Sequence, residues 1–452
     1  MPRPDPSAST RDPQRRARRR IRPWERFALV GLVLAVAVSV AITVTARGDD
    51  ETGAHHLTGE DAVAVAALLA RWGDAVRTAD DRALGAVVDR SAPAGFLDAE
   101  RMRAATVAAI GMSTFDYVLA DGADATVPAG LAESIGADAV LAPDVELRYA
   151  IDGIDPRPMT EPAPVLLARR GDRWTVVSDA LVGDAPAEDE TAGDGRWRGP
   201  WDFGTHGVVR TRDGSLVVGH ESDAALTESV AEALPDAIAA VSRMWDGEWP
   251  RRAAVVLTAT HDEFAALVGS GHAGANVAAV SVSDSVDREA GVATGQRIVF
   301  SPASRERLDA RSRAVVLRHE MTHIAARTET VDGSPLWMLE GYAEYVANRG
   351  DRAPAQIAPE LARRVRAGEV PESLPDDAAF TDAGAGPPAY EVSWSMSAFV
   401  ADRYGENTLT RLYRALATGP DADVAGVFES VLGASETDVL AAWRSWTAST
   451  LG

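Results

Sequence analysis

Two histidines one helical turn apart are the residues of this chain best spaced to do chemistry. They lie in the stretch HEMTHIAARTETVDGSPLWMLEGYAEY, where His319 and His323 are four positions apart and Glu320 stands between them. At about 100° per residue, both imidazoles share one face of a helix and can reach a single ion, while Glu320 lies beside a bound water. This pattern predicts a catalytic zinc site, which needs a third protein ligand and an open position.

A second helix downstream offers candidates for the third ligand. Ser334 is suited to cap its N-terminus and Pro335 to its first position, so the helix is predicted from Pro335 to about Asn348. Glu340 and Glu344 lie one turn apart on it. Two histidines and a glutamate in the His-Glu-x-x-His spacing also arise by chance, so the motif alone is weak evidence. The second helix, with its two glutamates, strengthens the zinc interpretation.

The two helices together resemble the gluzincin (peptidase MA-like) zinc metallopeptidases. In that family the second helix supplies the third ligand from a W-x-x-E-G-x-A segment, which this chain matches at Trp337, Glu340, Gly341 and Ala343. The resemblance implies that His319, His323 and Glu340 bind Zn²⁺. It also implies that Glu320 is the catalytic general base.

The same resemblance implies a supporting role for Glu344. This residue falls where thermolysin-type enzymes have an acid that orients the first histidine, and such carboxylates fix the imidazole tautomer. Only sixteen residues lie between His323 and Glu340. This is slightly fewer than in the best-known members, so Glu344 stays open as an alternative ligand. Glu329 is expected to be an exposed carboxylate near the end of the first helix.

A further match lies in PPAYEVSWSMSAFVADRYGENTLTRLYRAL. The aminopeptidase N branch of the gluzincins carries a Tyr-Glu pair at the start of a helix, and its tyrosine hydrogen-bonds the oxyanion; Tyr390 and Glu391 match in order and context. A phenol donor suits developing negative charge, whereas the alternative is a packing tyrosine. The Gly-x-Met-Glu-Asn motif of that branch is missing, so exopeptidase specificity is not supported. The strand QRIVF is expected to lie along the cleft and pair with an extended substrate.

The N-terminal stretch predicts a membrane anchor. Nine arginines against three acidic residues precede Phe27–Ala46, which carries no charge and is long enough to span a bilayer. The arginines favour a cytoplasmic tail with the rest of the chain outside. A cleaved signal peptide is the competing interpretation, although its apolar segment is usually shorter.

Composition narrows the class of protein further. The formal net charge of -22, despite the basic tail, argues against nucleic acid as a partner. The chain has no cysteine, so disulfides cannot stabilise an exported part. The remaining histidines are expected to be solvated or packing residues: His55, His56, His206, His220, His261 and His272.

The 452 residues are long enough for two or three domains. Helices followed by strands predict a small α+β domain, which resembles the cone-shaped nuclear transport factor two-like modules. A hairpin around Asp213-Gly214, further alternating strands and helices, and a helix-rich half predict a zincin-like domain with a mixed sheet. The expected divisions are a basic cytoplasmic tail (1–26), a transmembrane anchor (27–46), a linker (47–58), the α+β cone-like domain (59–183), a linker (184–200) and the metallopeptidase domain (201–452).

The sequence therefore predicts an α+β protein that is a single-pass, extracytoplasmic zinc peptidase with a peptide or protein substrate. Two alternatives remain open at this stage. One is a non-catalytic zinc-containing surface binding or sensor protein that keeps the peptidase fold. The other is zinc-dependent hydrolysis of a bond other than a peptide bond.

Overall fold

The chain folds as an α+β protein with a mixed sheet and many helices. The computed structural model describes residues 57, 59–122, 124–125, 127–180, 197–269, 277–350, 352–381 and 386–452. Within these ranges, no helix is both long and apolar enough to cross a membrane. The expected tail, the expected anchor at 27–46, His55, His56, His272 and most of the two expected linkers lie outside the described residues.

The N-terminal part combines helices with two antiparallel three-stranded sheets. The stretch LTGEDAVAVAALLARWGDAVRTADDRALGAVV predicts two helices, which α1 (Gly59–Thr78) and α2 (Asp81–Val87) confirm. The sequence does not predict α3 (Phe96–Ile110), α4 (Leu131–Ile135) or strand β1 (Met112–Leu119). The sheet orders are β1-β3-β4 and β2-β5-β6. The other strands are β2 (Ala139–Leu141), β3 (Val145–Ile151), β4 (Met159–Pro162), β5 (Leu166–Arg170) and β6 (Arg173–Ser178).

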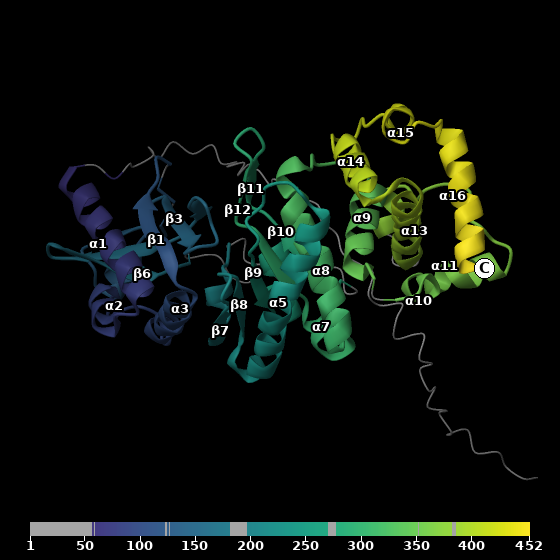
Figure 1. Cartoon of the computed structure of the whole chain (residues 1–452). Coiled ribbons are helices and arrows are strands. Elements are labelled where there is room, and N and C mark those ends of the chain that lie inside the picture. Colours follow the sequence, from purple (N-terminus) through teal and green to yellow (C-terminus); the bar gives the residue numbers. More distant parts are fainter. Residues whose placement is uncertain are drawn as a thin grey trace, which may run out of the picture.

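A five-stranded mixed sheet forms the centre of the molecule, in the order β10-β13-β9-β8-β7 (Figure 1). Strands β8, β9 and β13 are parallel, while β7 and β10 run antiparallel to their neighbours. The predicted hairpin around Asp213-Gly214 is confirmed as β7–β8. The strands are β7 (His206–Arg210), β8 (Leu216–His220), β9 (Ala254–Leu257), β10 (Ala279–Val282) and β13 (Arg297–Phe300), and a separate pair is β11 (Ser285–Asp287) with β12 (Val292–Thr294).

The prediction that QRIVF offers a free sheet edge is wrong. This segment is β13, which is paired with β10 on one side and with β9 on the other. The edge strand is β10, because the chain turns back through β11 and β12 and β13 then inserts between β10 and β9. Any substrate that extends the sheet on this side would therefore pair with β10.

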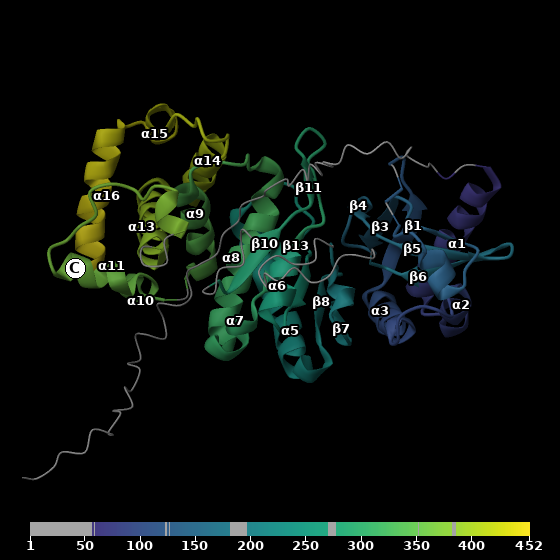
Figure 2. The ribbon, with the colours of Figure 1, turned by 180° about the vertical axis from the view of Figure 1, so that it is seen from behind.

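The two faces of the central sheet belong to different cores, because alternate residues of a strand point to opposite sides. One face packs on helices α5 (Ala224–Met244) and α8 (Ala310–Ala326) through Val217, Val255 and Ile298. The other face packs on the N-terminal part through Leu216, Val218 and Ala254. It also packs on α6 (His261–Val268) through Val256, Val280 and Val299. Figure 2 shows α6 in front of β10 and β13.

The C-terminal half is helical and adjoins the sheet layer through α8 (Figure 1). Helix α9 packs on both α8 and α13. The helices after the sheet are α7 (Pro302–Arg307), α8, α9 (Leu336–Asn348), α10 (Pro354–Ile357), α11 (Pro359–Arg366), α12 (Ala378–Thr381), α13 (Gly386–Tyr404), α14 (Glu406–Leu416), α15 (Val424–Leu432) and α16 (Glu436–Leu451).

Two predicted helix starts are corrected by the structure. The sequence RERLDARSRAVVLRHEMTHIAART predicts one helix from residue 305, but α7 ends at Arg307 and α8 starts after Asp309, whose carboxylate accepts a hydrogen bond from Ser312 N (2.8 Å). For the second helix, the N-cap is Pro335 and not Ser334. The Ser334 hydroxyl instead donates to Val331 O, while the carboxylate of Asp377 accepts from Leu336 N at 2.9 Å.

Buried ion pairs and aromatic rings join the N-terminal part to the sheet layer. Arg103 on α3 contacts Asp202 (2.8 Å) and Asp179 (2.7 Å), and it also pairs with Glu100. The ring of Trp201 meets Phe115 edge-on, with centroids 5.4 Å apart. These contacts, together with the shared apolar core, fix the N-terminal part against the sheet.

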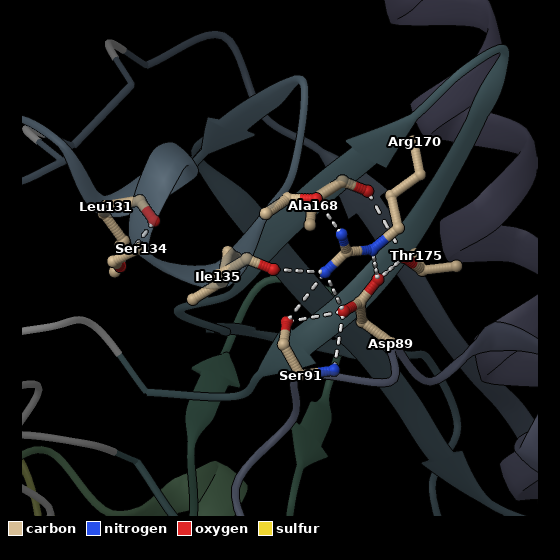
Figure 3. A network of polar contacts seen from close by, with 9 residues as sticks. Asp89, Ser91, Leu131, Ser134, Ile135, Ala168, Arg170 and Thr175 are labelled. Atoms are coloured by element: carbon tan, nitrogen blue, oxygen red, sulfur yellow. Dashed lines mark hydrogen bonds and ion pairs between the residues drawn. The ribbon is translucent and has the colours of Figure 1, made fainter.

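A partly exposed arginine pairs with a buried carboxylate inside the N-terminal part itself (Figure 3). Asp89 accepts hydrogen bonds from Arg170 at 2.9 and 3.0 Å, from the Thr175 hydroxyl at 2.6 Å and from Ser91 N at 2.8 Å. Arg170 also donates to the Ile135 carbonyl (3.0 Å). Burial alone would raise the pKa of Asp89, but these donors lower it well below its ordinary range.

Candidate metal centre

The two histidines of the candidate zinc site lie on a fully buried stretch of α8. This helix packs on α5, on the sheet and on α9, so its buried residues extend around most of its circumference from Val315 to Ala326. His319 and His323 are four residues apart and face the same side, with ring centroids 4.9 Å apart. The regular helix therefore brings both imidazoles to one place, as the spacing predicts.

The structure brings Glu340 of α9 to the same place. Its Oε2 lies 3.1 Å from His319 Nε2 and 3.5 Å from His323 Nε2, and the two Nε2 atoms are 3.0 Å apart. Nitrogen and oxygen ligands of a tetrahedral zinc lie about 3.3 Å from one another, since each bond is about 2.0–2.2 Å long. These three donor atoms are thus spaced as a zinc ion would require.

The chemistry of the donor set also fits a cation. Glu340 is buried, and its Oε1 has no hydrogen-bond partner among the described residues. Burial alone would raise the pKa of Glu340, but the two imidazoles lower it to about 2, so the carboxylate is charged. Burial alone would lower the pKa of His319, yet Glu340 and Glu344 raise it well above its ordinary value. This buried group of side chains therefore favours a positive charge at its centre.

Glu344 contacts the other ring nitrogen of His319. Its Oε1 lies 3.2 Å from Nδ1, although the approach falls short of regular hydrogen-bond geometry, and its Oε2 accepts from Asn348 Nδ2 at 2.9 Å. A carboxylate at Nδ1 orients the ring and leaves Nε2 for the ion. Between the two open alternatives, this geometry favours Glu340 as the ligand and Glu344 as its support.

Glu320 is buried directly beside the donor atoms. Burial raises its pKa to about 7, although His319 and His323 oppose that shift. Ser281 on the edge strand β10 faces Glu320 without reaching regular hydrogen-bond geometry. A carboxylate whose pKa lies near neutrality is suited to accept and return a proton.

Tyr390 lies near His319, with ring centroids 6.4 Å apart, and packs edge-on against Phe380. It sits on α13, where Gly341 lets α9 and α13 approach closely. Its neighbour Glu391 has a different contact: the carboxylate accepts from Leu361 N (2.6 Å) at the start of α11. Burial raises the pKa of Glu391 to about 7. Of the predicted Tyr-Glu pair, only Tyr390 is thus near the donor atoms.

Glu329 lies outside this group. It is exposed, as expected, in the short turn Arg327–Glu329 that follows α8, and it forms an ion pair with Arg414 at 2.5 Å. This contact gives the carboxylate a structural partner on α14.

A cavity of about 220 Å³ opens beside His323. The edge strand β10, the loop between α8 and α9, and the start of α9 contribute its walls, with Tyr413 from α14. This volume is below the roughly 300 Å³ of small-molecule sites and suits a single side chain. The lining residues are Ser281, Ser283, Gln296, His323, Ile324, Arg327, Thr330, Val331, Asp332, Gly333, Ser334, Leu336, Leu339, Asp377 and Tyr413.

A second group with metal-binding side chains is not predicted from the sequence. His206, His220 and Glu263 offer ligand atoms that all lie within 4.8 Å of one another. The prediction that His206 and His220 are ordinary surface or packing residues does not anticipate this arrangement, whereas His261 is exposed as expected. A partial signal was available: the predicted hairpin around Asp213-Gly214 brings both histidines to the same end of the strand pair, although the observed register, centred on Asp213, is what sets them opposite each other.

No protein-family model matches the chain, and no curated protein matches it either.

Proposed function

We propose that this chain is a zinc-dependent peptidase that hydrolyses peptide bonds outside the cytoplasm. The observation that carries the proposal is the convergence of His319, His323 and Glu340 at 3.0 to 3.5 Å beside the buried carboxylate of Glu320. Three protein ligands leave one position for water or substrate, which is the arrangement of catalytic zinc. A merely structural site would have no need for a carboxylate with a near-neutral pKa beside the ligands.

The proposed chemistry divides the work among a bound zinc and three side chains. The contribution of a bound zinc is to polarise the scissile carbonyl and to lower the pKa of a water molecule. Glu320 accepts a proton from the attacking water and transfers it to the leaving amine. Glu344 holds His319 in the tautomer whose Nε2 faces the ion. The Tyr390 hydroxyl donates to the oxygen on which negative charge develops.

The surroundings of the site support an extended peptide as substrate. In the described part of the chain, β10 is paired only with β13, so its other edge is available to a substrate backbone. Ser281 and Ser283 of this edge region also line the cavity beside His323. A peptide lying along β10 would place one side chain in the cavity, whose lining includes Ile324 and Leu339.

We infer a zincin-like fold for the C-terminal part and a cone-like fold for the N-terminal part. Support for the first is the mixed sheet with an antiparallel edge strand next to α8, followed by the ligand-bearing α9. Support for the second is the set of helices packed on small antiparallel sheets.

The location is proposed from the N-terminal sequence. The uncharged segment 27–46 after an arginine-rich tail favours a single-pass anchor with the catalytic part outside. The measurement is alkaline extraction of membranes, followed by protease treatment of intact cells. Release of the chain by alkali would contradict the anchor, and protection from external protease would contradict the orientation.

The catalytic proposal is tested by Glu320→Gln in the full chain, purified in detergent. We expect this variant to retain zinc and to lose cleavage of a broad peptide library, with products identified by mass spectrometry. Glu329→Gln is the matched control, because this glutamate follows the same helix and contacts Arg414 instead of the site. The proposal fails if the wild type cleaves no peptide, or if Glu320→Gln cleaves as well as the control.

A further inference from the structure

Two histidines and a glutamate lie together at the end of the β7–β8 hairpin. His206 begins β7 and His220 ends β8, and the two residues are paired directly across the strands. Residues paired in this way have Cβ atoms about 4.5–5.5 Å apart and side chains on the same side of the sheet. Glu263 in the first turn of α6 completes the group. Because His220 shares its face with Leu216 and Val218, the group lies on the sheet face opposite to α8.

The three side chains are spaced like ligands of one metal ion. His220 Nε2 lies 2.9 and 3.0 Å from the two oxygens of Glu263, and His206 Nε2 lies 3.7 Å from Glu263 Oε1. The expected separation of ligand atoms around a tetrahedral zinc, about 3.3 Å, falls between these values. The His206 and His220 ring centroids are 4.3 Å apart, so both imidazoles reach the same point.

The orientation of His206 is the observation that points to a ligand. Its Nδ1 lies 2.9 Å from the carbonyl oxygen of Gly204, which can only accept, so Nδ1 carries a proton and Nε2 is the ring nitrogen that faces Glu263 and His220. The side chain is 0% exposed, and Nε2 has no hydrogen-bond partner among the described residues. Nδ1 bonded to a carbonyl with Nε2 facing other ligands is the usual arrangement of a metal-binding histidine.

Glu263 is held ready as a charged ligand. Its side chain is 1% exposed, and Oε2 accepts from Ala259 N at 2.7 Å. Burial alone would raise the pKa of Glu263, but His206, His220 and the Ala259 amide lower it to about 2. The carboxylate is therefore ionised at neutral pH, inside a buried group where an uncompensated charge is costly.

We propose that His206, His220 and Glu263 form a second zinc site, separate from the site on α8 and α9. Two imidazoles and one carboxylate are ligands that zinc accepts, and the partly exposed His220 leaves room for water as the fourth ligand. A simple ion pair between protonated His220 and Glu263 is the competing explanation. That pair leaves the buried Nε2 of His206 without a hydrogen bond, because its contact with Glu263 Oε1 is 3.7 Å long.

The position of this group indicates a stabilising role. A single ion would tie the edge strand β7, the end of β8 and helix α6 together. The Gly204 carbonyl that orients His206 also accepts a hydrogen bond from Thr106 on α3, at 3.3 Å. The second site thus lies beside the contact between the sheet layer and the N-terminal part, and bound metal would hold both in place.

Metal analysis of the full chain tests the proposal. The background is the double variant His323→Ala, Glu340→Ala, which removes two of the three proposed ligands of the first site. We expect the wild type to bind two zinc ions per chain, the double variant one, and the double variant with added Glu263→Gln none. His261→Gln is the matched control, because this histidine is exposed and lies two residues from Glu263, and it should leave the zinc content of the background unchanged.

The outcomes separate this proposal from the catalytic one. A wild type with one zinc and a double variant with none would overturn the second site and leave the first intact. One zinc in the wild type that persists in the double variant would support the second site and count against the first. Circular dichroism shows whether the double variant with added Glu263→Gln folds. If it does not, zinc is instead titrated into the double variant after treatment with a chelator. Absence of a one-to-one endpoint there would overturn the proposal.

Discussion

Gly341 next to the proposed ligand Glu340 allows a sharp test of how α9 is held. A Cβ at this position would lie 2.5 Å from Ser393 O and 3.0 Å from Ser397 Oγ on α13, whereas ordinary contact begins near 3.4 Å. Gly341→Ala must therefore push α9 and α13 apart by about 0.9 Å. Overpacking of this kind costs roughly 1–3 kcal/mol, and the better helix propensity of alanine returns up to about 1 kcal/mol.

We expect Gly341→Ala to lower the free energy of unfolding by about 1–2 kcal/mol, with a fall in Tm of about 2–4 °C for each kcal/mol. Because Glu340 is the preceding residue, zinc affinity should fall as well. The assays are thermal unfolding and competition with a chromophoric chelator. Gly85→Ala is the matched control: this helical glycine has open space around it, so the same change should be neutral or slightly stabilising. Equal stability and zinc affinity of wild type and Gly341→Ala would refute the argument.

Three further predictions concern the site and the N-terminal part. Glu344→Gln should weaken zinc binding by about 10–100-fold in the same chelator competition, and unchanged affinity would contradict its orienting role. Tyr390→Phe should lower kcat by about 10²–10³-fold with zinc content unchanged, if its hydroxyl stabilises the oxyanion; wild-type kcat would assign it to packing. Asp89→Asn should destabilise the chain by about 1–3 kcal/mol at pH 7 in urea unfolding, because it replaces the buried carboxylate that accepts from Arg170, Thr175 and Ser91. Since the pKa of Asp89 is lower in the folded chain than its ordinary value of 3.8, this contribution is present above that pH and is lost as the pH falls below it. Hence the free energies of unfolding of the wild type and Asp89→Asn should converge as the pH falls below 3.8. The control Asp81→Asn replaces an exposed carboxylate and should change stability by less than about 0.5 kcal/mol at neutral or acid pH.

The parts of the site that depend on local spacing could be predicted from the sequence. Four-residue spacing on a helix determines that His319 and His323 share a face, and one-turn spacing does the same for Glu340 and Glu344. The position of the two histidines relative to the two glutamates could be predicted only from the resemblance to the gluzincins, because no local rule fixes how α8 and α9 pack. Gly341 is the glycine of the W-x-x-E-G-x-A segment. The close approach of α9 and α13 at this position gives a physical reason for a residue without a side chain.

Features that join distant segments could not be predicted in this way. Asp377, 41 residues away along the chain, accepts the hydrogen bond at the start of α9 that the prediction gives to Ser334. Strand order is equally non-local: the composition of QRIVF suits an edge or a centre, and only the pairing with β9 and β10 decides between them. His206 and His220 are an intermediate case. The predicted hairpin already implies that they lie near each other, but Glu263 reaches them only through the packing of α6.

The two faces of the central sheet also bear on the role of the N-terminal part. If that part were only a spacer between membrane and enzyme, the sheet face toward it would be expected to carry polar residues. Instead Leu216, Val218 and Ala254 are buried in the same core as Phe115 and Tyr149. Removing the N-terminal part would expose these apolar side chains to water and leave Asp202 without Arg103. The N-terminal part therefore completes the fold that carries the candidate metal sites, and both faces of one sheet link it to α8.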